Sequence, residues 1–186
     1  MLQLILLLSL LLSGLACQGG GRPDGTAART PGREVAVPPD TVITLQRTIC
    51  YGMCPAYKLT IRGDGTLIYE GKEFVKTTGT VKSSVTREQL KELLSEFEKA
   101  DYFSLRDSYQ TMSDGCPTYW TDNPSANTSI QLGGRRKAIA HYYGCQEEEG
   151  YKVYPQKLYV LESRIDEIVN SARWVKGGDR GAAPLR

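Results

Sequence analysis

The chain contains little histidine and lacks several sequence motifs that mark enzyme active sites. Its 186 residues include a single histidine, His141, and no Gly-x-Ser-x-Gly stretch, so a serine or histidine hydrolase lacks a complete set of groups. A glycine-rich phosphate loop and a dinucleotide-binding fingerprint are also missing. The net charge of +2 is too small to indicate a nucleic-acid partner. We therefore expect a protein that is not an enzyme and that uses no cofactor.

Charged residues are mostly scattered, with two exceptions. Arg135-Arg136-Lys137 is the only tight basic run, and it follows a Gly-Gly pair between two predicted strands. We interpret it as the solvated end of a hairpin. Glu147-Glu148-Glu149 is interpreted in the same way, as a solvated loop.

The amino terminus indicates export. Residues 1–16 are uncharged and rich in leucine, but the apolar part is too short to span a bilayer comfortably. Small residues and Cys17 follow, an order typical of a secretory signal peptide. Gly14-Leu15-Ala16-Cys17 also resembles a bacterial lipoprotein cleavage site, at which the cysteine takes the lipid. We expect a periplasmic or outer-envelope protein with Cys17 lipidated. The alternative is a plain signal peptide cut nearby, which leaves Cys17 without a role.

Composition divides the rest of the chain into three parts. Residues 17–40 are rich in Gly, Pro, Arg and Ala, which predicts a disordered tether beginning at the lipidated cysteine. Residues 41–176 contain the periodic apolar patterns and form the single predicted domain. Residues 177–186 are predicted to be a disordered tail.

The cysteine count supports an oxidising compartment. With Cys17 assigned to lipid, four of the five cysteines remain, enough for two disulfides: Cys50, Cys54, Cys116 and Cys145. Gly52 allows a sharp bend between the first two, so we expect a Cys50–Cys54 staple. Cys116 and Cys145 then pair and pin a long loop to the end of a hairpin. A crossed arrangement, such as Cys54 with Cys145, is the alternative.

Hydrophobic periodicity predicts an α+β domain. The predicted elements are strands at 42–47, 57–62, 66–70 and 73–85, a helix at 87–100, strands at 128–132 and 137–143, and a helix at 156–173. A capping box at Thr86 and Gln89 marks the start of the first helix. The order β-β-β-β-α-β-β-α favours a two-layer fold, with an antiparallel sheet and two helices on one face.

Several of these residues resemble a known family. The Cys50-Tyr51-Gly52-Met53-Cys54-Pro55 motif follows an Arg-Thr pair, and Gly63-Asp64-Gly65 joins the next two strands. Thr121-Asp122-Asn123-Pro124 and Thr128-Ser129-Ile130 come later. Together they resemble a bacterial family catalogued as domain of unknown function 6438, over about residues 42–170. The resemblance implies an exported protein, often tethered as a lipoprotein, and implies no activity. The Cys116–Cys145 pair looks like an addition to the family pattern.

A copper-binding or redox role is the alternative function. The Cys-x3-Cys-Pro spacing resembles the copper loop of Sco-type chaperones, and the candidate ligands are Cys50, Met53, Cys54 and His141. A thioredoxin-type site, however, needs a cysteine on a helix that lowers a thiol pKa. Here the second cysteine leads into an alternating strand. We therefore favour the staple, and place His141 on one face of a strand.

Aromatic residues give the remaining signal for binding. Eleven tyrosines are present, and the candidate binding residues are Tyr119, Trp120, Tyr142 and Tyr143. Tyrosine suits recognition because it offers apolar area and a hydroxyl group, although it equally suits the edges of a small sheet. We expect any binding surface, with an envelope protein as its partner, to lie on segments 109–124 and 142–155, which the second disulfide would hold together.

Overall fold

The computed structural model describes residues 36–149 and 151–175. The predicted signal peptide, Cys17, most of the predicted tether and the predicted tail lie outside these residues. The described part begins before residue 41 with contacts of its own: Val37 packs against the core, and the Asp40 carboxylate accepts hydrogen bonds from two backbone N–H groups.

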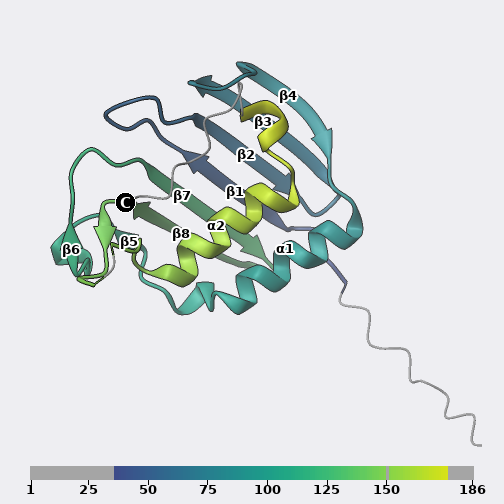
Figure 1. Ribbon diagram of the computed structural model, residues 1–186. Helices are drawn as coiled ribbons and strands as arrows, with labels where there is room; N and C mark the ends of the chain where they lie inside the picture. The colour runs from purple at the N-terminus through teal and green to yellow at the C-terminus, as the bar shows by residue number, and fades with distance from the viewer. Residues whose placement is uncertain (1–35, 150, 176–186) are drawn as a thin grey trace, which may run out of the picture. The chain divides into compact units, whose positions relative to one another are not determined.

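The described elements follow one another along the chain as β1 (Val42–Arg47), β2 (Ala56–Arg62), β3 (Thr66–Glu73), β4 (Gly79–Ser84), α1 (Arg87–Lys99), the 3-10 turn η1 (Tyr102–Ser104), β5 (Ser108–Tyr109), the 3-10 turn η2 (Met112–Asp114), β6 (Thr118–Tyr119), β7 (Ser125–Leu132), β8 (Arg135–Tyr142), β9 (Cys145–Gln146), α2 (Gln156–Ile168) and α3 (Ala172–Val175) (Figure 1). Seven strands form one sheet in the order β4-β3-β2-β1-β7-β8-β5. All neighbours are antiparallel except β5 and β8, and β6 pairs with β9 in a separate ribbon. The α+β class and the mostly antiparallel sheet are confirmed.

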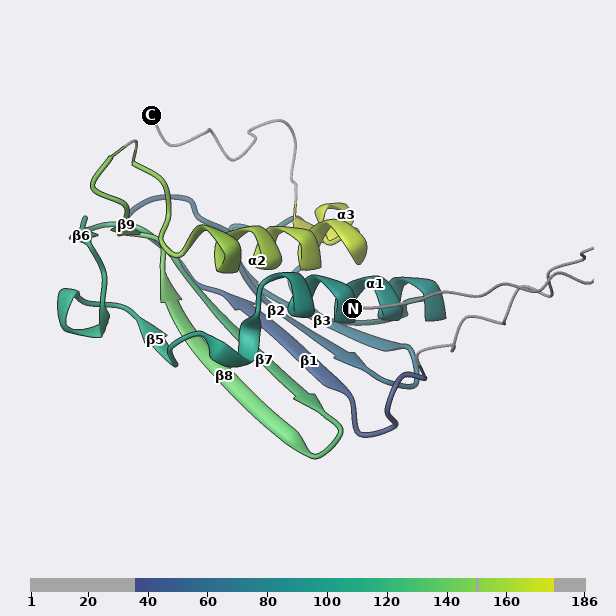
Figure 2. The ribbon, with the colours of Figure 1, turned by 90° about the horizontal axis from the view of Figure 1, so that it is seen from below.

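The helices lie along one face of the sheet, as Figure 2 shows. Strand alternation supplies the sheet side of the core, with Ile43 and Leu45 on β1 fully buried and the intervening Thr44 only partly so. The helix side comes from the apolar stripes of α1 and α2, including Leu93 and Leu161. The predicted capping box is present: Gln89 N–H donates to the hydroxyl of Thr86.

Two predicted elements differ in extent. The strand expected at 73–85 begins only at Gly79, because Phe74 adopts a φ of 53° and the chain turns there. The helix expected at 156–173 stops at Ile168, because Asn170 has a φ of 53°. The short helix α3 then starts in a new direction and buries Trp174, whose ring stacks on that of Tyr69 at 4.9 Å. The helix therefore ends where Trp174 packs against the core, and the apolar stripe of residues 156–173 gave no sign of this break.

The connection between the helix expected at 87–100 and the strand expected at 128–132 contains more structure than the sequence indicated. It includes β5, β6 and two 3-10 turns, and β7 begins at Ser125 instead of residue 128. These short strands carry little sequence signal, because each is two residues long and depends on a partner strand for its hydrogen bonds.

Candidate functional site: the disulfide end of the sheet

Both disulfides lie at one end of the large sheet. Strand pairing places the last residue of β1 beside the first residues of β2 and β7, and the end of β8 beside the start of β7. The end of β3 and the start of β4 meet at the same side. We call this end the disulfide end; its segments are 48–55, 74–78, 110–124, 143–149 and 151–155. The opposite end, with segments 36–41, 63–65, 85–86 and 133–134, is the turn end.

The first disulfide, Cys50–Cys54, closes the loop between β1 and β2 across a Cα–Cα distance of 5.5 Å. Gly52 has a φ of 148°, a backbone conformation that residues with a Cβ rarely adopt, so glycine suits this bend. The loop is attached to the segment before β7. Tyr51 N–H donates to the carbonyl of Asp122 at 3.3 Å, and Thr48 N–H donates to that of Ser125 at 3.0 Å.

The second disulfide, Cys116–Cys145, ties the segment before β7 to β9. Both sulfur-bearing residues are buried, and Trp120 N–H donates to the carbonyl of Gly144 at 2.8 Å. A Cβ on Gly144 would lie 1.9 Å from the Trp120 carbonyl oxygen, so only glycine permits this approach. The two disulfides therefore have the connectivity that the sequence favoured, and the second holds segments 109–124 and 142–155 together as expected.

Exposed apolar side chains collect at the disulfide end. Among the described residues, the exposed large hydrophobic side chains are Ile49, Tyr51, Met53, Phe74, Met112, Tyr119, Trp120, Tyr151 and Val160, and all but Val160 belong to this end. Tyr51 is 89% exposed and Met53 is 71% exposed. Such clustering is typical of a surface that meets a partner, because apolar groups scattered singly are the ordinary case.

The predicted binding residues fall into two groups. Tyr119 and Trp120 are half-exposed and their rings contact those of Tyr142 and Tyr151, at centroid distances of 5.2 and 5.8 Å. Tyr142 is half-buried, and its hydroxyl donates to the Trp120 carbonyl at 2.8 Å. Tyr143 is buried, which corrects its assignment to the surface. Successive residues along an extended chain point to opposite faces, so Tyr142 faces outward and Tyr143 faces α2.

Beneath this end lies a buried network of polar side chains that the sequence analysis missed. Arg47, the last residue of β1, donates from Nε and Nη2 to Oδ2 of Asp166 on α2, at 3.0 and 2.8 Å. Tyr57 and Ser171 donate hydroxyl hydrogens to the other carboxylate oxygen at 2.7 and 2.6 Å. Arg47 also donates to the hydroxyl of Tyr143, which extends the network toward β8.

Glu162 is the centre of the second half of the network, and its side chain is fully buried. It accepts hydrogen bonds from the hydroxyls of Tyr143 at 2.8 Å and Thr128 at 3.2 Å. The His141 Nδ1 lies 2.9 Å from a Glu162 oxygen, and the Nε2 lies 3.0 Å from the Tyr154 carbonyl. A carbonyl can only accept, so Nε2 carries the hydrogen in the contact with Tyr154.

The phenols in this network remain protonated donors. Burial raises the pKa of Tyr143 well above its ordinary value, and the neighbouring Glu162 charge adds to the effect. Burial, followed by the charge of Asp166, likewise raises the pKa of Tyr57. Across the described part of the chain, every buried side-chain nitrogen or oxygen has a hydrogen-bond partner. The network thus connects α2 to β1, β2, β7 and β8 directly below the exposed loops.

One signal in the sequence pointed to this network. Glu162 lies on the apolar stripe of α2, four residues after Leu158 and three before Ile165. A carboxylate on a buried helix face requires partners, because burying an unpaired charge is costly. Its partners come from strands far away in the sequence, so the pattern alone could not identify them.

A family match covers almost all of these residues. The family described as a domain of unknown function, DUF6438, matches residues 41–169. The chain belongs to the DUF6438 family. No curated protein matches the chain. The matched range of the DUF6438 domain contains both disulfides, Arg47, Glu162 and Asp166, and it ends at the break between α2 and α3.

The DUF6438 domain does not assemble the four copper ligands considered from the sequence. Within residues 36–149 and 151–175, no group of three or more His, Cys, Asp or Glu side chains could hold a metal ion. Both nitrogens of His141 already have partners, and Met53 extends into solvent. Both cysteines of the first pair are disulfide-bonded.

Two further observations bear on location. Two disulfides are consistent with an oxidising, exported location. Within the described residues, no helix combines the length and the hydrophobicity that crossing a membrane requires.

Proposed function

We propose that the chain is an exported, lipid-anchored protein of the bacterial cell envelope whose DUF6438 domain binds a partner protein through the disulfide end, without catalysis. The observation that carries this proposal is the collection of exposed apolar side chains on loops that are cross-linked twice. Cross-links and cross-loop hydrogen bonds reduce the conformational entropy that ordering such loops on binding would cost. Aromatic side chains held in this way are common among residues that dominate binding energy.

The buried network supports a binding role better than a catalytic one. Glu162 and His141 have no exposed side-chain surface, so a substrate cannot reach them in this conformation. Of two hollows on the described surface, one lies beside Arg135–Ala138 and the other over the polar face of the central strands, and Thr128 is the one network residue in their linings. The network instead fixes the strand ends from which the exposed loops project.

Strand direction agrees with a tether at the amino terminus. β1 starts at the turn end, so the chain enters the domain at the end opposite the disulfides. A domain anchored through Cys17 would therefore be attached at its turn end, and its disulfide end would be available to a partner.

A photo-crosslinking experiment tests the binding surface. A photoreactive amino acid at position 51 in the full-length protein, expressed in its own cells, is expected to give a defined protein adduct. The same group at position 160, the exposed apolar residue outside the disulfide end, is the matched control. The adduct should weaken when Trp120 is replaced by serine. Equal adducts from both positions, or none from position 51, would contradict the proposal.

Anchoring has a separate test. Mass spectrometry of the mature amino-terminal peptide should show a lipid on Cys17, and Cys17→Ala should release the protein from the membrane fraction. A mature chain that begins elsewhere would remove the anchor from the proposal and leave the binding surface untouched.

Copper or redox chemistry at Cys50, Met53, Cys54 and His141 is the alternative function. The engaged nitrogens of His141 count against copper binding. Cys50 and Cys54 are partly exposed, so thiol–disulfide exchange at this pair is the version of the alternative function to test.

A further inference from the structure

Part of the outer edge of β8 has no partner strand. β5 pairs only with Ala140 and His141, and Ala140 N–H donates to the Asp107 carbonyl at 3.0 Å. Backbone groups two residues apart along a strand point the same way. The N–H and C=O groups of Ala138 and Arg136 must therefore also face away from β7. Among residues 36–149 and 151–175, no backbone hydrogen bond made by a turn or loop uses them, and the pairing with β5 involves only Ala140 and His141.

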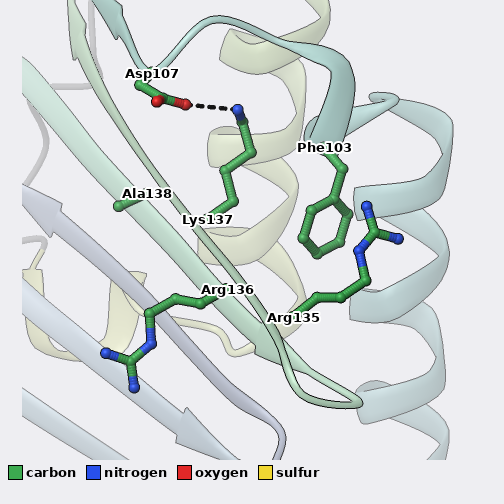
Figure 3. A pocket seen from close by; sticks show the side chains of 6 residues that line it. All are labelled: Phe103, Asp107, Arg135, Arg136, Lys137 and Ala138. Carbon is green, nitrogen blue, oxygen red and sulfur yellow. Dashed lines mark hydrogen bonds and ion pairs between the residues drawn. The ribbon is translucent and has the colours of Figure 1, made fainter.

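A hollow of about 690 Å³ lies beside this free edge. Figure 3 shows its lining: Arg135, Arg136, Lys137 and Ala138 from β8, Phe103 from η1, and Asp107 from the segment before β5. Arg135, Arg136 and Ala138 are exposed. The backbone groups of the edge thus border open space.

The charge around this edge is mainly positive. Lys137 forms an ion pair with Asp107 at 2.6 Å. Arg136 instead donates to the neutral side chain of Gln131 at 2.6 Å. The guanidinium of Arg135 lies over the ring of Phe103, with its carbon 3.9 Å from the ring centroid (Figure 3). Two of the three cations therefore have no carboxylate partner among the described residues.

We propose that an acidic peptide segment from another protein binds here as an added strand, continuing the sheet along β8 beyond the point where β5 stops. The backbone groups of Arg136 and Ala138 would supply the hydrogen bonds, as in other cases of strand addition. Side chains on a strand alternate between the two faces, so carboxylates at alternate positions of the peptide would meet either Arg136 on one face or Arg135, beside the paired Lys137, on the other. Arg135 offers a planar group suited to bidentate binding of a carboxylate.

Charge complementarity favours an acidic partner over a second copy of the chain. Two copies of this edge would bring like charges together, and charged edge residues are a common way to prevent such pairing. The site is separate from the disulfide end, so the two binding proposals stand or fall independently.

The experiment uses the mature chain and a capped heptapeptide of alternating glutamate and valine. Amide NMR spectra are recorded as the peptide is added up to millimolar concentration. Saturable shifts centred on the amides of residues 135–138 are expected. A peptide with lysine in place of glutamate, and a glutamate peptide N-methylated at the amides that would face β8, should both fail to produce them.

Variants separate strand pairing from simple charge attraction. Ala138→Pro removes an N–H that points away from β7, so the sheet should keep its internal pairing while peptide binding is lost. Ala138→Val, which keeps that N–H, is the matched control and should bind. Arg136→Gln should weaken binding by about three-fold, within the range known for single exposed ion pairs.

Three outcomes would overturn the proposal. The N-methylated peptide could bind as well as its parent, which would indicate charge attraction without strand pairing. The shifts could centre on β4, the strand at the other edge of the sheet. The free protein could instead show concentration-dependent shifts at residues 135–138, which would make a second copy the occupant. If Ala138→Pro fails to fold, the N-methylated peptide on the unaltered chain still decides the question.

Discussion

The antiparallel strands are connected by short turns at one end of the sheet and mostly by long loops at the other. At the turn end, Gly63–Gly65 joins β2 to β3 and Gly133-Gly134 joins β7 to β8. Asp64 accepts from Thr66 N–H at 2.8 Å, and Asp40 accepts from the N–H groups of the Gly pair. At the disulfide end the connections are long, cross-linked by two disulfides and attached to one another by backbone hydrogen bonds.

The two ends differ in how much apolar surface they expose, and this difference motivates the binding role proposed for the disulfide end. Short turns complete the sheet with few residues, and the described turn end exposes no large hydrophobic side chain. The long connections expose most of the apolar side chains found at the described surface, and both the disulfides and a buried polar network hold them in place. Loops that carry function on a rigid scaffold are a common arrangement. The contrast leads to four predictions, in order of decreasing expected effect.

Loss of the buried network should cause the largest effect. Glu162→Ala leaves His141, Tyr143 and Thr128 without their shared acceptor, and breaking a buried pair in this way costs about 3–5 kcal/mol of unfolding free energy. Urea denaturation measures this loss. Glu167→Ala, on the same helix but with an exposed carboxylate, is the matched control and should cost less than about 1 kcal/mol. Equal losses would mean that the network does not stabilise the disulfide end.

Removal of the second disulfide should come next. Replacing Cys116 and Cys145 by serine opens a loop with a sequence separation of 29, for which chain entropy gives a loss of about 3.5 kcal/mol. Replacing Cys50 and Cys54, with a separation of 4, should cost about 2 kcal/mol. Thermal and urea unfolding of the two double variants compare these losses. A larger loss of unfolding free energy on removing Cys50–Cys54 would show that this disulfide stabilises the fold by more than loop-closure entropy.

The two disulfides should also differ in their response to reductant. Cys116 is 4% exposed and Cys145 is fully buried, whereas Cys50 and Cys54 are partly exposed. Thiol–disulfide exchange requires access to a sulfur atom, so a mild reductant should open Cys50–Cys54 first. Timed alkylation and peptide mapping of the native protein reveal the order. Reduction of both bonds at the same rate would indicate that the disulfide end opens as a whole.

The smallest effect belongs to the turn end. The hydrogen bond from Gly134 N–H, with that from Gly133, lowers the pKa of Asp40 below its ordinary value of 3.8. A lowered folded-state pKa means that this interaction stabilises the fold fully above the unfolded pKa and is lost as pH falls through the folded pKa. Carboxyl NMR titration should give a midpoint below 3.8. Asp40→Asn should abolish that titration and cause a small loss of stability near neutral pH, where the interaction is fully present, with no loss at low pH. A midpoint at or above the ordinary value would contradict stabilisation of the Asp40 carboxylate by the N–H groups of Gly133 and Gly134.

The sequence was most informative where structure is local. Alternation identified β1, β2 and β3, the capping box fixed the start of α1, and Gly63-Asp64-Gly65 marked a hairpin turn. Each depends on neighbours a few residues apart. The short strand β5, in contrast, exists only because β8 lies beside it, and Asn170 interrupts the last helix where Trp174 finds its place against Tyr69.

The candidate sites divide in the same way. Tyr119 and Trp120 were predicted as binding residues from their residue type, and the structure shows that both are exposed. Tyr143 was assigned to that surface too, and only the packing of α2 shows that it is buried. Phe74, on the turn between β3 and β4, was not considered for binding at all, because its sequence position gives no sign that it lies at the same end of the sheet as Tyr51.

By itself, the sequence determined the family, the α+β class and most strand and helix positions, because these follow from short-range patterns. It favoured the observed cysteine pairs but left a crossed arrangement open, and the structure decides between them. Tertiary structure alone decided which side chains share a surface and which share a buried network. Arg47 and Asp166 are 119 residues apart in the chain and meet only because α2 packs across the end of β1. Contacts of that kind depend on strand order and helix placement, which no local pattern contains.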